Sequence, residues 1–310
     1  MKILITGAGG YIGSMLSDQL VRQGYKVIAI DTMKYAKNSL NHLFFYDNFK
    51  FVNADVTSES VLKKHVKNVD FIIPLAALVG APICEKNKKQ ATAVNFTQIK
   101  IILKLINKNQ KIIYLNSNSG YGVGKKNKYC TEESSLNPIS HYGITKVQSE
   151  QYIVKNFKNF VCFRLATVFG YSYRMRTDLI VNYYIKEAIN NKNLEIFEPH
   201  FRRNFIHVKD VTKAIQFAIE NFNKVKGQIY NLGLSNANIT KLELAKKIKK
   251  VIPKLKIKII RGKKDPDQRD YFVSNKKIEK RGFKAKFSLE RGINEVYQSL
   301  TLYNDYKNNY

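Results

Sequence analysis

The fold of this chain is decided by its opening stretch, Lys2–Gly13, which has the sequence KILITGAGGYIG. The apolar run Lys2–Thr6 predicts a buried strand, and Tyr11–Gln23 has helical spacing up to Gly24. Between them a tight turn needs Gly7, close approach of a pyrophosphate to the backbone needs Gly10, and helix packing favours Gly13. The helix N-terminus would add N–H donors and a positive dipole for phosphates. The stretch therefore predicts a dinucleotide site with contacts from Gly7, Gly10, Tyr11, Ile12 and Gly13.

An acidic residue in the right place supports this prediction. The second predicted strand, Lys26–Ile30, stops at Asp31, where a carboxylate can accept both hydroxyls of an adenosine ribose. The same carboxylate would repel a 2′-phosphate, and Lys34 is the only cation close to it in the sequence, so NAD is favoured over NADP. The alternative is that Asp31 is a simple turn residue. Further cofactor contacts are expected after the third and fourth strands, at Asp55, Val56, Leu75, Ala76 and Ala77.

The first half of the chain alternates strands with helical segments. This alternation predicts an α/β fold with a doubly wound parallel sheet of the Rossmann type. The further predicted strands are Phe49–Asp55, Val69–Leu75, Lys111–Asn116 and Phe160–Leu165, and the clearest helices are Ala91–Ile106 and His141–Phe157.

After Gly170 the pattern is less regular, which predicts a smaller substrate-binding lobe over the carboxyl edge of the sheet. We expect residues 1–170 to form the NAD-binding domain, with 204–232 returning to it, and residues 171–203 and 233–310 to form the lobe. The segments predicted here are a loop and helix over Arg174–Asn190, strands Phe205–His207 and Ile257–Ile260, and helices Val211–Phe222, Lys241–Val251 and Leu289–Tyr306.

A second motif indicates the chemistry. Tyr142 and Lys146 are one helical turn apart, and Ser117 follows a predicted strand. A tyrosine with its ordinary pKa near 10 is a poor base, and lowering it to about 7 costs about 4 kcal/mol, which a neighbouring ammonium can supply. Lys146 could also hold the nicotinamide ribose. Ser117 would bond a reacting hydroxyl while Tyr142 takes its proton and a hydride leaves to the nicotinamide. Chance spacing of tyrosine and lysine is the alternative, which the ordered serine and glycine turn disfavour.

Composition sets limits on other classes of function. One interpretation of the net charge of +29 is binding to nucleic acid or to an anionic surface. The lysines are spread along all 310 residues, however, which favours the other interpretation, a solvated surface. We therefore expect no nucleic-acid partner. No apolar run approaches the ~18 residues of a membrane span, and no signal peptide is recognisable, so a cytoplasmic protein is expected. Cys84, Cys130 and Cys162 form no disulfide or metal pattern.

Together these motifs resemble the extended short-chain dehydrogenase/reductase family of nucleotide-sugar epimerases and dehydratases. The resemblance covers nearly the whole chain, through Thr6–Gly13, Asp31, Leu75–Ala77, Ser117–Gly122, Tyr142–Lys146, Arg164–Gly170, Arg203–Val208 and Arg269–Tyr271. It implies that Asn95 supports the cofactor site and that Arg203 and Arg269 hold a substrate diphosphate, with Asn182 as a further substrate contact. It also implies a homodimer formed through Ala91–Ile106 and His141–Phe157.

Departures from the family pattern narrow the reaction. Sugar 4,6-dehydratases of this family carry an Asp-Glu pair just after the catalytic hydroxyl, whereas this chain has Asn118 and Ser119. The 3,5-epimerising relatives use a cysteine in this loop, and none is present. Thr167 stands where many relatives carry asparagine. The stretch Phe169–Leu179 resembles a subgroup that includes GDP-heptose 4-dehydrogenases.

The expected function is therefore NAD-dependent oxidation of a nucleotide-diphosphate sugar at C4, in polysaccharide sugar biosynthesis. A released keto sugar would make the enzyme a 4-dehydrogenase, and a ketone reduced on its other face would make it a 4-epimerase. The same residues serve both outcomes, and the subgroup resemblance favours the dehydrogenase. A non-catalytic NAD-binding or RNA-associated protein is the alternative from another class, which the retained Tyr142 and Lys146 disfavour.

Overall fold

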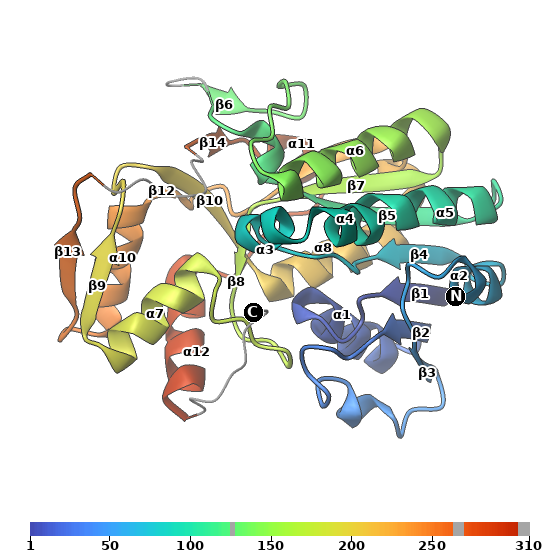
Figure 1. Cartoon of the computed structure of the whole chain (residues 1–310), viewed down its shortest axis with the longest axis horizontal. Helices are drawn as coiled ribbons and strands as arrows, with labels where there is room; N and C mark the ends of the chain where they lie inside the picture. The colour runs from blue at the N-terminus through green and yellow to red at the C-terminus, as the bar shows by residue number, and fades with distance from the viewer. Residues whose placement is uncertain (125–127, 263–269, 303–310) are drawn as a thin grey trace.

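The computed structural model describes residues 1–124, 128–262 and 270–302. Within them, one parallel sheet of seven strands forms the centre of the molecule (Figure 1). Its strands, in spatial order, are β11 (Gln228–Leu232), β7 (Phe160–Leu165), β5 (Lys111–Ser117), β4 (Phe71–Pro74), β1 (Lys2–Thr6), β2 (Lys26–Asp31) and β3 (Phe49–Asn53). The chain runs outward from β1 in one direction and from β4 in the other, so the strand order reverses between them. Parallel doubly wound sheets bind ligands at such a reversal, beyond the carboxyl ends of the strands.

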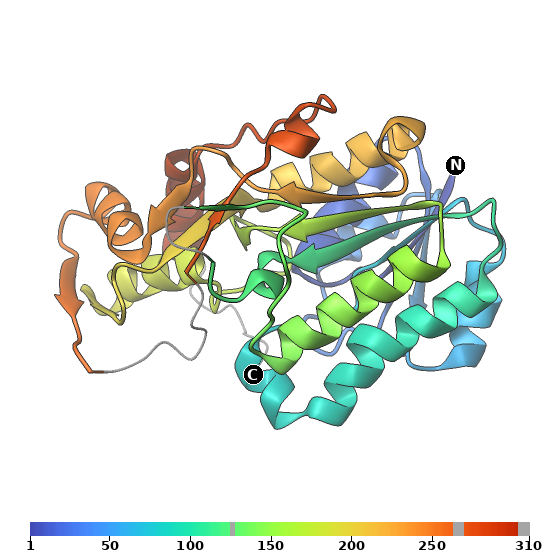
Figure 2. The ribbon, with the colours of Figure 1, turned by 90° about the horizontal axis from the view of Figure 1, so that it is seen from above.

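Alternation along the strands explains why both faces of the sheet are covered. In β1, Ile3 and Ile5 face one apolar core and Leu4 faces the other, and all three side chains are fully buried. Strands buried on both faces are therefore continuous apolar runs, as the sequence predicted. Helices α1 (Tyr11–Arg22) and α8 (Val208–Glu220) cover the first face, whereas α2 (Glu59–Val66), α5 (Gln98–Leu105) and α6 (His141–Asn156) cover the second (Figure 2).

The predicted helix Ala91–Ile106 is not one regular helix. It consists of α4 (Lys88–Thr92), a π-turn η2 (Ala93–Thr97) and α5. The widened turn holds Asn95, whose side chain bonds the loop that follows β4, so a tertiary contact accompanies the break in the regular hydrogen-bond ladder. Helices α2 and α3 (Ala81–Lys86) and the short helices η1 (Asn41–Leu43), η3 (Asn118–Tyr121), α9 (Phe222–Val225) and α11 (Lys276–Glu279) were not predicted.

The lobe lies over the carboxyl ends of the central strands (Figure 1). It contains helices α7 (Ile180–Asn190), α10 (Lys241–Val251) and α12 (Leu289–Leu302), which contact one another. Short strands form three small sheets outside the central one. In the first, β10 (Arg202–His207) lies between β12 (Asn238–Thr240) and β8 (Thr167–Phe169) and pairs with both. In the other two, β9 (Asn193–Ile196) pairs with β13 (Lys256–Ile259), and β6 (Tyr129–Cys130) pairs with β14 (Phe272–Val273).

Many strand and helix ends differ from the sequence prediction by one to three residues, and two of the differences have an identifiable cause. Strand β10 begins at Arg202, three residues before the predicted Phe205, because its first residues pair with β12. Helix α8 begins at Val208 instead of Val211, because the side chain of His207 accepts a hydrogen bond from the backbone N–H of Lys209 and caps the helix there. Strand β11 joins the sheet beside β7, and α8 packs on α1. The division into two domains stays a prediction.

Candidate active site

A cavity of about 970 Å³ runs from the carboxyl ends of β1, β2 and β4 to the inner surface of the lobe. One end is lined by the glycine turn after β1, together with Asp31 and Asp55. The middle is lined by Ser117, Tyr142 and Lys146, and the lobe end by residues that include Glu195, Arg203 and Lys241. The structure therefore brings the two motifs of the sequence to one cavity.

The glycine turn has the geometry that its residue types suggested. Gly7 has φ +67°, and a Cβ there would lie 2.5 Å from the backbone nitrogen of Ala76, so the turn packs directly on the chain leaving β4. A Cβ on Gly13 would overlap the carbonyl oxygen of Gly7. At Gly10 a Cβ would approach only the Gly7 oxygen, at 3.1 Å, and Gly10 lines the cavity. This cradle, followed by the open N-terminus of α1, fits a pyrophosphate-containing dinucleotide.

The carboxylate of Asp31 faces the same end of the cavity and is fixed by the backbone. Its oxygens accept hydrogen bonds from the N–H groups of Gly9, at 2.9 Å, and Met33, at 2.8 Å. Burial raises the pKa of Asp31, and these N–H groups together with the charge of Arg174 act in the opposite direction. Lys34 is the only cation near Asp31 in the sequence, but the fold brings a second one close: Arg174, distant in sequence, acts on Asp31 and has its guanidinium 5.5 Å from the ring centre of Tyr35.

This arrangement predicts the effect of removing the carboxylate. Asp31→Ala should weaken NAD binding about 10- to 100-fold, because a charge-assisted hydrogen bond contributes about 1.5–3 kcal/mol. NADP binding should stay the same or rise, because the carboxylate that repels a 2′-phosphate is gone and the charge of Arg174 remains near that position. Fluorescence titration of the protein with NAD and with NADP gives the two dissociation constants and so the NAD/NADP affinity ratio. The control is Asp47→Ala, because Asp47 is an exposed acid outside the cavity. An unchanged NAD/NADP ratio in Asp31→Ala would contradict this role.

All the other predicted cofactor residues except Asn95 line the cavity. Besides Tyr11 they are Ile12, Asp55, Val56, Leu75, Ala76 and Ala77. Tyr11 also lines it, but its hydroxyl donates a 2.6 Å hydrogen bond to the carbonyl of Gly170 and so ties α1 to the chain entering the lobe. Asn95 is not among the lining residues. Its amide bonds both the N–H and the carbonyl of Leu78, at 2.8 and 3.1 Å, and so holds the loop that borders the cavity.

Ser117 ends β5 and lines the middle of the cavity. Its Oγ accepts hydrogen bonds from the backbone N–H of Ser119, at 3.2 Å, and from the Ser119 hydroxyl, at 3.0 Å. Ser119 also lines the cavity, whereas the neighbouring Asn118 is 1% exposed and does not. Sequence comparison treated Ser119 only as a missing acid, and its contact with Ser117 was not foreseen.

Tyr142 lies in the first turn of α6, where local sequence fixes the start of the helix. The hydroxyl of Ser140 accepts a hydrogen bond from the N–H of Gly143 and caps α6. The Tyr142 ring packs against the apolar cluster of Leu78 and Cys84. The phenol is therefore held between α6 and the loop after β4, at the wall of the cavity.

Lys146 follows one turn later and is 6% exposed. Its Nζ lies 4.1 Å from the ring centre of Tyr114, a cation–π distance. Burial lowers the pKa of Lys146 to about 7, with the charge of Glu150 acting in the opposite direction. The ammonium and the free amine of Lys146 are therefore close in free energy near neutral pH, which suits a group that takes part in proton transfer.

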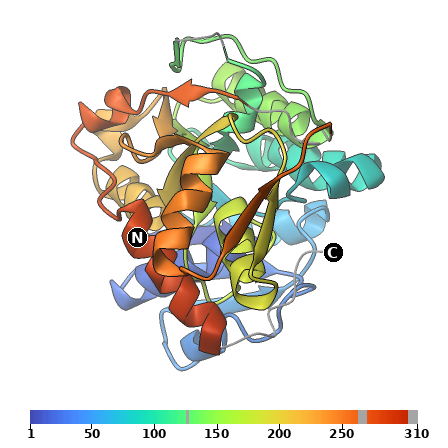
Figure 3. The same cartoon turned by 90° about the vertical axis from the view of Figure 1, so that its left-hand side faces the viewer.

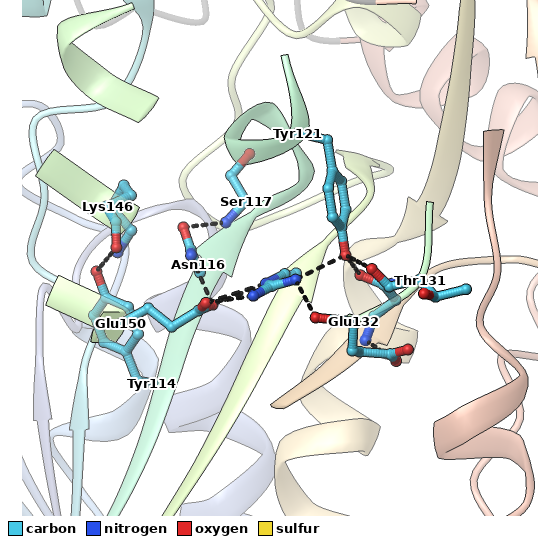
Figure 4. Close-up of polar contacts among 10 residues, drawn as sticks. Tyr114, Asn116, Ser117, Tyr121, Thr131, Glu132, Lys146 and Glu150 are labelled. Atoms are coloured by element: carbon cyan, nitrogen blue, oxygen red, sulfur yellow. Dashed lines mark hydrogen bonds and ion pairs between the residues drawn. The ribbon is translucent and has the colours of Figure 1, made fainter. Parts of the chain in front are cut away.

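A buried polar network supports the catalytic wall from behind (Figure 4). The carboxylate of Glu150 accepts hydrogen bonds from Asn116, at 2.7 Å, and from the guanidinium of Arg164, also at 2.7 Å. Asn116 in turn accepts the N–H of Ser117, at 2.8 Å. Arg164 and Glu150 are 4% and 2% exposed as side chains, so the ion pair joins α6 to β7 without solvent screening. The network links the end of β5, which carries Ser117, to the helix that carries Tyr142 and Lys146.

The predicted substrate contacts have different positions. Arg203 is buried and lines the lobe end of the cavity, with its guanidinium 6.0 Å from the ring centre of Tyr271. Asn182 is fully buried and does not line the cavity. Its amide donates to the carbonyl of Arg176, at 2.8 Å, and accepts the N–H of Gly170, at 3.3 Å. Asn182 thus holds the loop before α7 in shape. Arg269 lies outside the described residues.

Several lining residues had no signal in the sequence. Arg174, Arg176, Glu195 and Lys241 come from the loop before α7, from β9 and from the start of α10, and only the packing of the lobe on the sheet brings them together. Residues 79–82, at the end of the loop after β4 and the start of α3, also line the site. Gly80 and Pro82 were a detectable turn signal in the sequence, and Gly80 has φ +116°.

No group of three or more His, Cys, Asp or Glu side chains in the described part of the chain could hold a metal ion. The same residues include no helix long and apolar enough to cross a membrane. The three cysteines are free and buried.

Comparison with known proteins places this site in a family. The chain is 29% identical over 248 residues to a protein of Bacillus subtilis named as an uncharacterized UDP-glucose epimerase, which covers 75% of this chain and 77% of that protein. It is 27% identical over 270 residues to dTDP-D-glucose 4,6-dehydratase of Dictyostelium discoideum, over 80% of this chain and 61% of that protein.

Solved structures have the same fold over nearly the full length. UDP-glucose 4-epimerase of Thermotoga maritima, solved with UDP-glucose, superposes with a TM-score of 0.85 at 25% identity and covers 97% of this chain and 100% of that one. A variant of UDP-glucuronic acid 4-epimerase from Bacillus cereus, in complex with a UDP-sugar and NAD, gives 0.87 at 25% identity, over 97% and 99%.

The sequence profile of one family matches residues 3–233, well over half of the chain, and this match includes the glycine turn, Ser117, Tyr142 and Lys146. The cofactor cradle described above fits the NAD that the family requires. The chain is therefore an enzyme of the NAD dependent epimerase/dehydratase family.

Proposed function

We propose that the protein oxidises the C4 hydroxyl of a nucleotide-diphosphate sugar, with Tyr142 as the proton acceptor. One observation carries the proposal: Ser117, Tyr142 and Lys146 line the middle of a cavity whose one end fits NAD and whose other end is lined by Arg203 and Lys241. A substrate with an anionic diphosphate in the lobe places its sugar beside the catalytic residues. The nucleotide sugars of the compared epimerases and dehydratases support this class of substrate.

The hydrogen bonds of Ser117 show whether its hydroxyl would donate to a substrate or accept from it. Its Oγ already accepts from the N–H and the hydroxyl of Ser119, so both lone pairs are used. The proton of Ser117 is left to donate to the substrate oxygen. That bond strengthens as the substrate oxygen loses its proton and gains negative charge before the hydride leaves, which is the property of a group that stabilises the transition state.

The proton balance uses the Tyr142–Lys146 pair. The phenolate of Tyr142 takes the hydroxyl proton while the ammonium of Lys146 stabilises the phenolate charge. NAD, when bound, accepts the hydride with its electron pair. Gly7, Gly10, Gly13 and Asp31 would hold the dinucleotide, and Lys146 would also bond the nicotinamide ribose.

The buried lysine predicts a pH dependence for oxidation. Below about pH 7 the Tyr142–Lys146 pair carries an additional proton and cannot accept another, because burial sets the pKa of Lys146 at about 7. We expect kcat/KM for oxidation to rise about tenfold per pH unit below about 7 and to level off above it. Lys146→Met should move the inflection upward, toward the ordinary tyrosine pKa near 10. An inflection near 7 that survives in Lys146→Met would contradict the assignment.

The fate of the keto sugar decides whether the enzyme is a 4-dehydrogenase or a 4-epimerase. On the resemblance of Phe169–Leu179 to GDP-heptose 4-dehydrogenases, we favour release of a 4-keto product, from GDP-heptose, in polysaccharide sugar biosynthesis. The 4-epimerases among the similar structures favour the second candidate, in which the ketone receives the hydride on its other face and NAD is recycled in place. Dehydration is disfavoured, because Asn118 is buried away from the cavity and the Ser119 hydroxyl is neither a general acid nor a general base at neutral pH.

We also propose a homodimer, formed through α5, α6 and the turn η2 that precedes α5. Ile144 and Val154 on α6 are 36% and 43% exposed, and Phe96 of η2 packs edge to face on Tyr152 of α6. Burial of these apolar side chains against a second copy would stabilise the pair of chains. Light scattering at micromolar concentration should give twice the chain mass of 35.8 kDa. A mass that stays at one chain over this range would refute the dimer.

The experiment that tests the function is a panel of GDP-, UDP-, dTDP- and CDP-sugars, including GDP-heptose, followed by proton NMR in heavy water. Loss of the C4 proton signal with a 4-keto product establishes the dehydrogenase. An inverted C4 centre that keeps its proton establishes the epimerase. A full panel without conversion, from protein that binds NAD, would refute the proposal.

A further inference from the structure

The lobe end of the cavity carries a carboxylate whose position follows from strand alternation. In β9, Leu194 and Ile196 are buried in the main apolar core, while Glu195 faces the other way and lines the cavity. Phe197, two residues on, lines the cavity as well. Strand β9 lies in the lobe, at the opposite end of the molecule from β3 (Figure 1), and Figure 3 views the molecule from the lobe side.

Two cations line the same end. Lys241 begins α10 and is 3% exposed, with its Nζ 5.8 Å from the ring centre of Phe201 and its N–H bonded to the Phe201 carbonyl. Arg203 lies on β10, between β12 and β8. Glu195, Phe197 and Lys241 therefore line the same end of the cavity as Arg203, and strand β9 contacts helix α10 there.

This end is where the base of a nucleotide sugar would lie, an inference that rests on the proposed function. If the sugar reacts at Tyr142 and Arg203 holds the diphosphate, the nucleoside extends past Arg203 to β9 and α10. An anionic side chain is unexpected beside a diphosphate, unless it serves a group that donates hydrogen bonds.

Only one common base has an edge that suits a carboxylate with two acceptor oxygens. Guanine presents two adjacent donors, N1–H and the 2-amino group, beside the acceptors O6 and N7. Uracil and thymine present a single N–H between two carbonyl oxygens, which a carboxylate would repel. Cytosine and adenine each present one amino group beside acceptor atoms, so neither offers two adjacent donor groups. We propose that Glu195 selects guanine by accepting from N1–H and the 2-amino group, with Phe197 against the base and Lys241 on the acceptor side.

A structural role for Glu195 is the competing explanation. Glu195 and Lys258 are partners in the parallel pairing of β9 and β13, and their charged atoms are 3.8 Å apart. Their side chains are 53% and 71% exposed, so this ion pair is screened by solvent and contributes little. Lys258 does not line the cavity, which makes Lys258→Met a matched control that removes the ion pair and leaves the carboxylate in place.

The test is calorimetric binding of GDP, IDP and UDP to the full-length, NAD-saturated protein. IDP lacks the 2-amino group and so removes one of the two proposed donors. Wild type should bind GDP about tenfold more tightly than IDP and at least tenfold more tightly than UDP. Glu195→Gln keeps one acceptor oxygen but loses the charge and the second acceptor, so it should weaken GDP binding about 10- to 100-fold, leave UDP within about threefold and reduce the difference between GDP and IDP. Lys258→Met should behave as wild type.

The outcomes separate this inference from the function on which it rests. If no nucleotide binds, the proposed nucleotide-sugar function is wrong as well. If UDP binds as tightly as GDP, the substrate class stands and the guanine inference fails. If GDP is preferred but the GDP/IDP ratio is the same in Glu195→Gln, or if Lys258→Met reproduces the loss, Glu195 does not recognise the base.

Discussion

Tyr142→Phe should reduce kcat about 10²- to 10⁴-fold, the usual contribution of a positioned general base. The phenyl ring keeps the packing against Leu78 and Cys84, so the cavity wall should be unchanged. NAD affinity should stay within about threefold, because the dinucleotide is held mainly by the glycine turn and Asp31. Turnover and NAD titration on the same preparation measure the two effects.

The matched control is Tyr152→Phe, on the same helix and outside the cavity. It should leave kcat unchanged. Equal turnover of Tyr142→Phe and wild type would remove Tyr142 from the mechanism, whatever the NAD affinity.

Arg164→Met should destabilise the fold by about 3–5 kcal/mol, because it leaves the carboxylate of Glu150 buried without its cation. Glu150 is 2% exposed as a side chain and also bonds Asn116, so water cannot replace the guanidinium without opening the packing of α6 on the sheet. Urea unfolding followed by circular dichroism measures the change in the free energy of unfolding.

Two variants make this result interpretable. Arg22→Met removes a cation from an exposed, solvent-screened i,i+4 pair with Asp18, so its urea midpoint should match that of wild type. The double variant Glu150→Gln, Arg164→Met should recover part of the loss, since no buried charge remains unpaired. If Arg164→Met unfolds at the same urea concentration as Arg22→Met, the network does not support the catalytic wall.

Much of the fold could be predicted because its signals are local. The run Lys2–Thr6 and the glycines after it specify strand, turn and helix within 22 residues, and the structure has β1 and α1 at those positions. The catalytic set Ser117, Tyr142 and Lys146 could also be predicted, because Ser117 follows a predicted strand and Tyr142 and Lys146 are one helical turn apart. In the structure all three line the same cavity. The glycine turn and the Tyr142–Lys146 pair could be predicted because their residues are neighbours in the chain, whereas Ser117 is brought to them by the packing of β5 and α6.

The parts that could not be predicted depend on contacts between distant segments. Arg174 reaches Asp31 across more than 140 residues, and Glu195 faces the cavity only because α7 and β13 orient β9. The π-turn at Asn95 is set by the loop after β4, not by the helical pattern of its own segment. Asn182 has the residue type of a substrate ligand, yet the packing of α7 turns its amide toward Gly170 and Arg176.

The most direct test of the central claim follows the hydrogen on C4. The donor identified by the panel is prepared with deuterium at C4 and turned over by the NAD-bound enzyme, and mass spectrometry of the dinucleotide and the sugar locates the label. Hydride transfer predicts deuterium on the nicotinamide if the keto sugar is released, or back on the sugar if NAD is recycled in place. Deuterium released to water would mean proton abstraction at C4, and would contradict the role of Tyr142, Ser117 and NAD proposed for this enzyme.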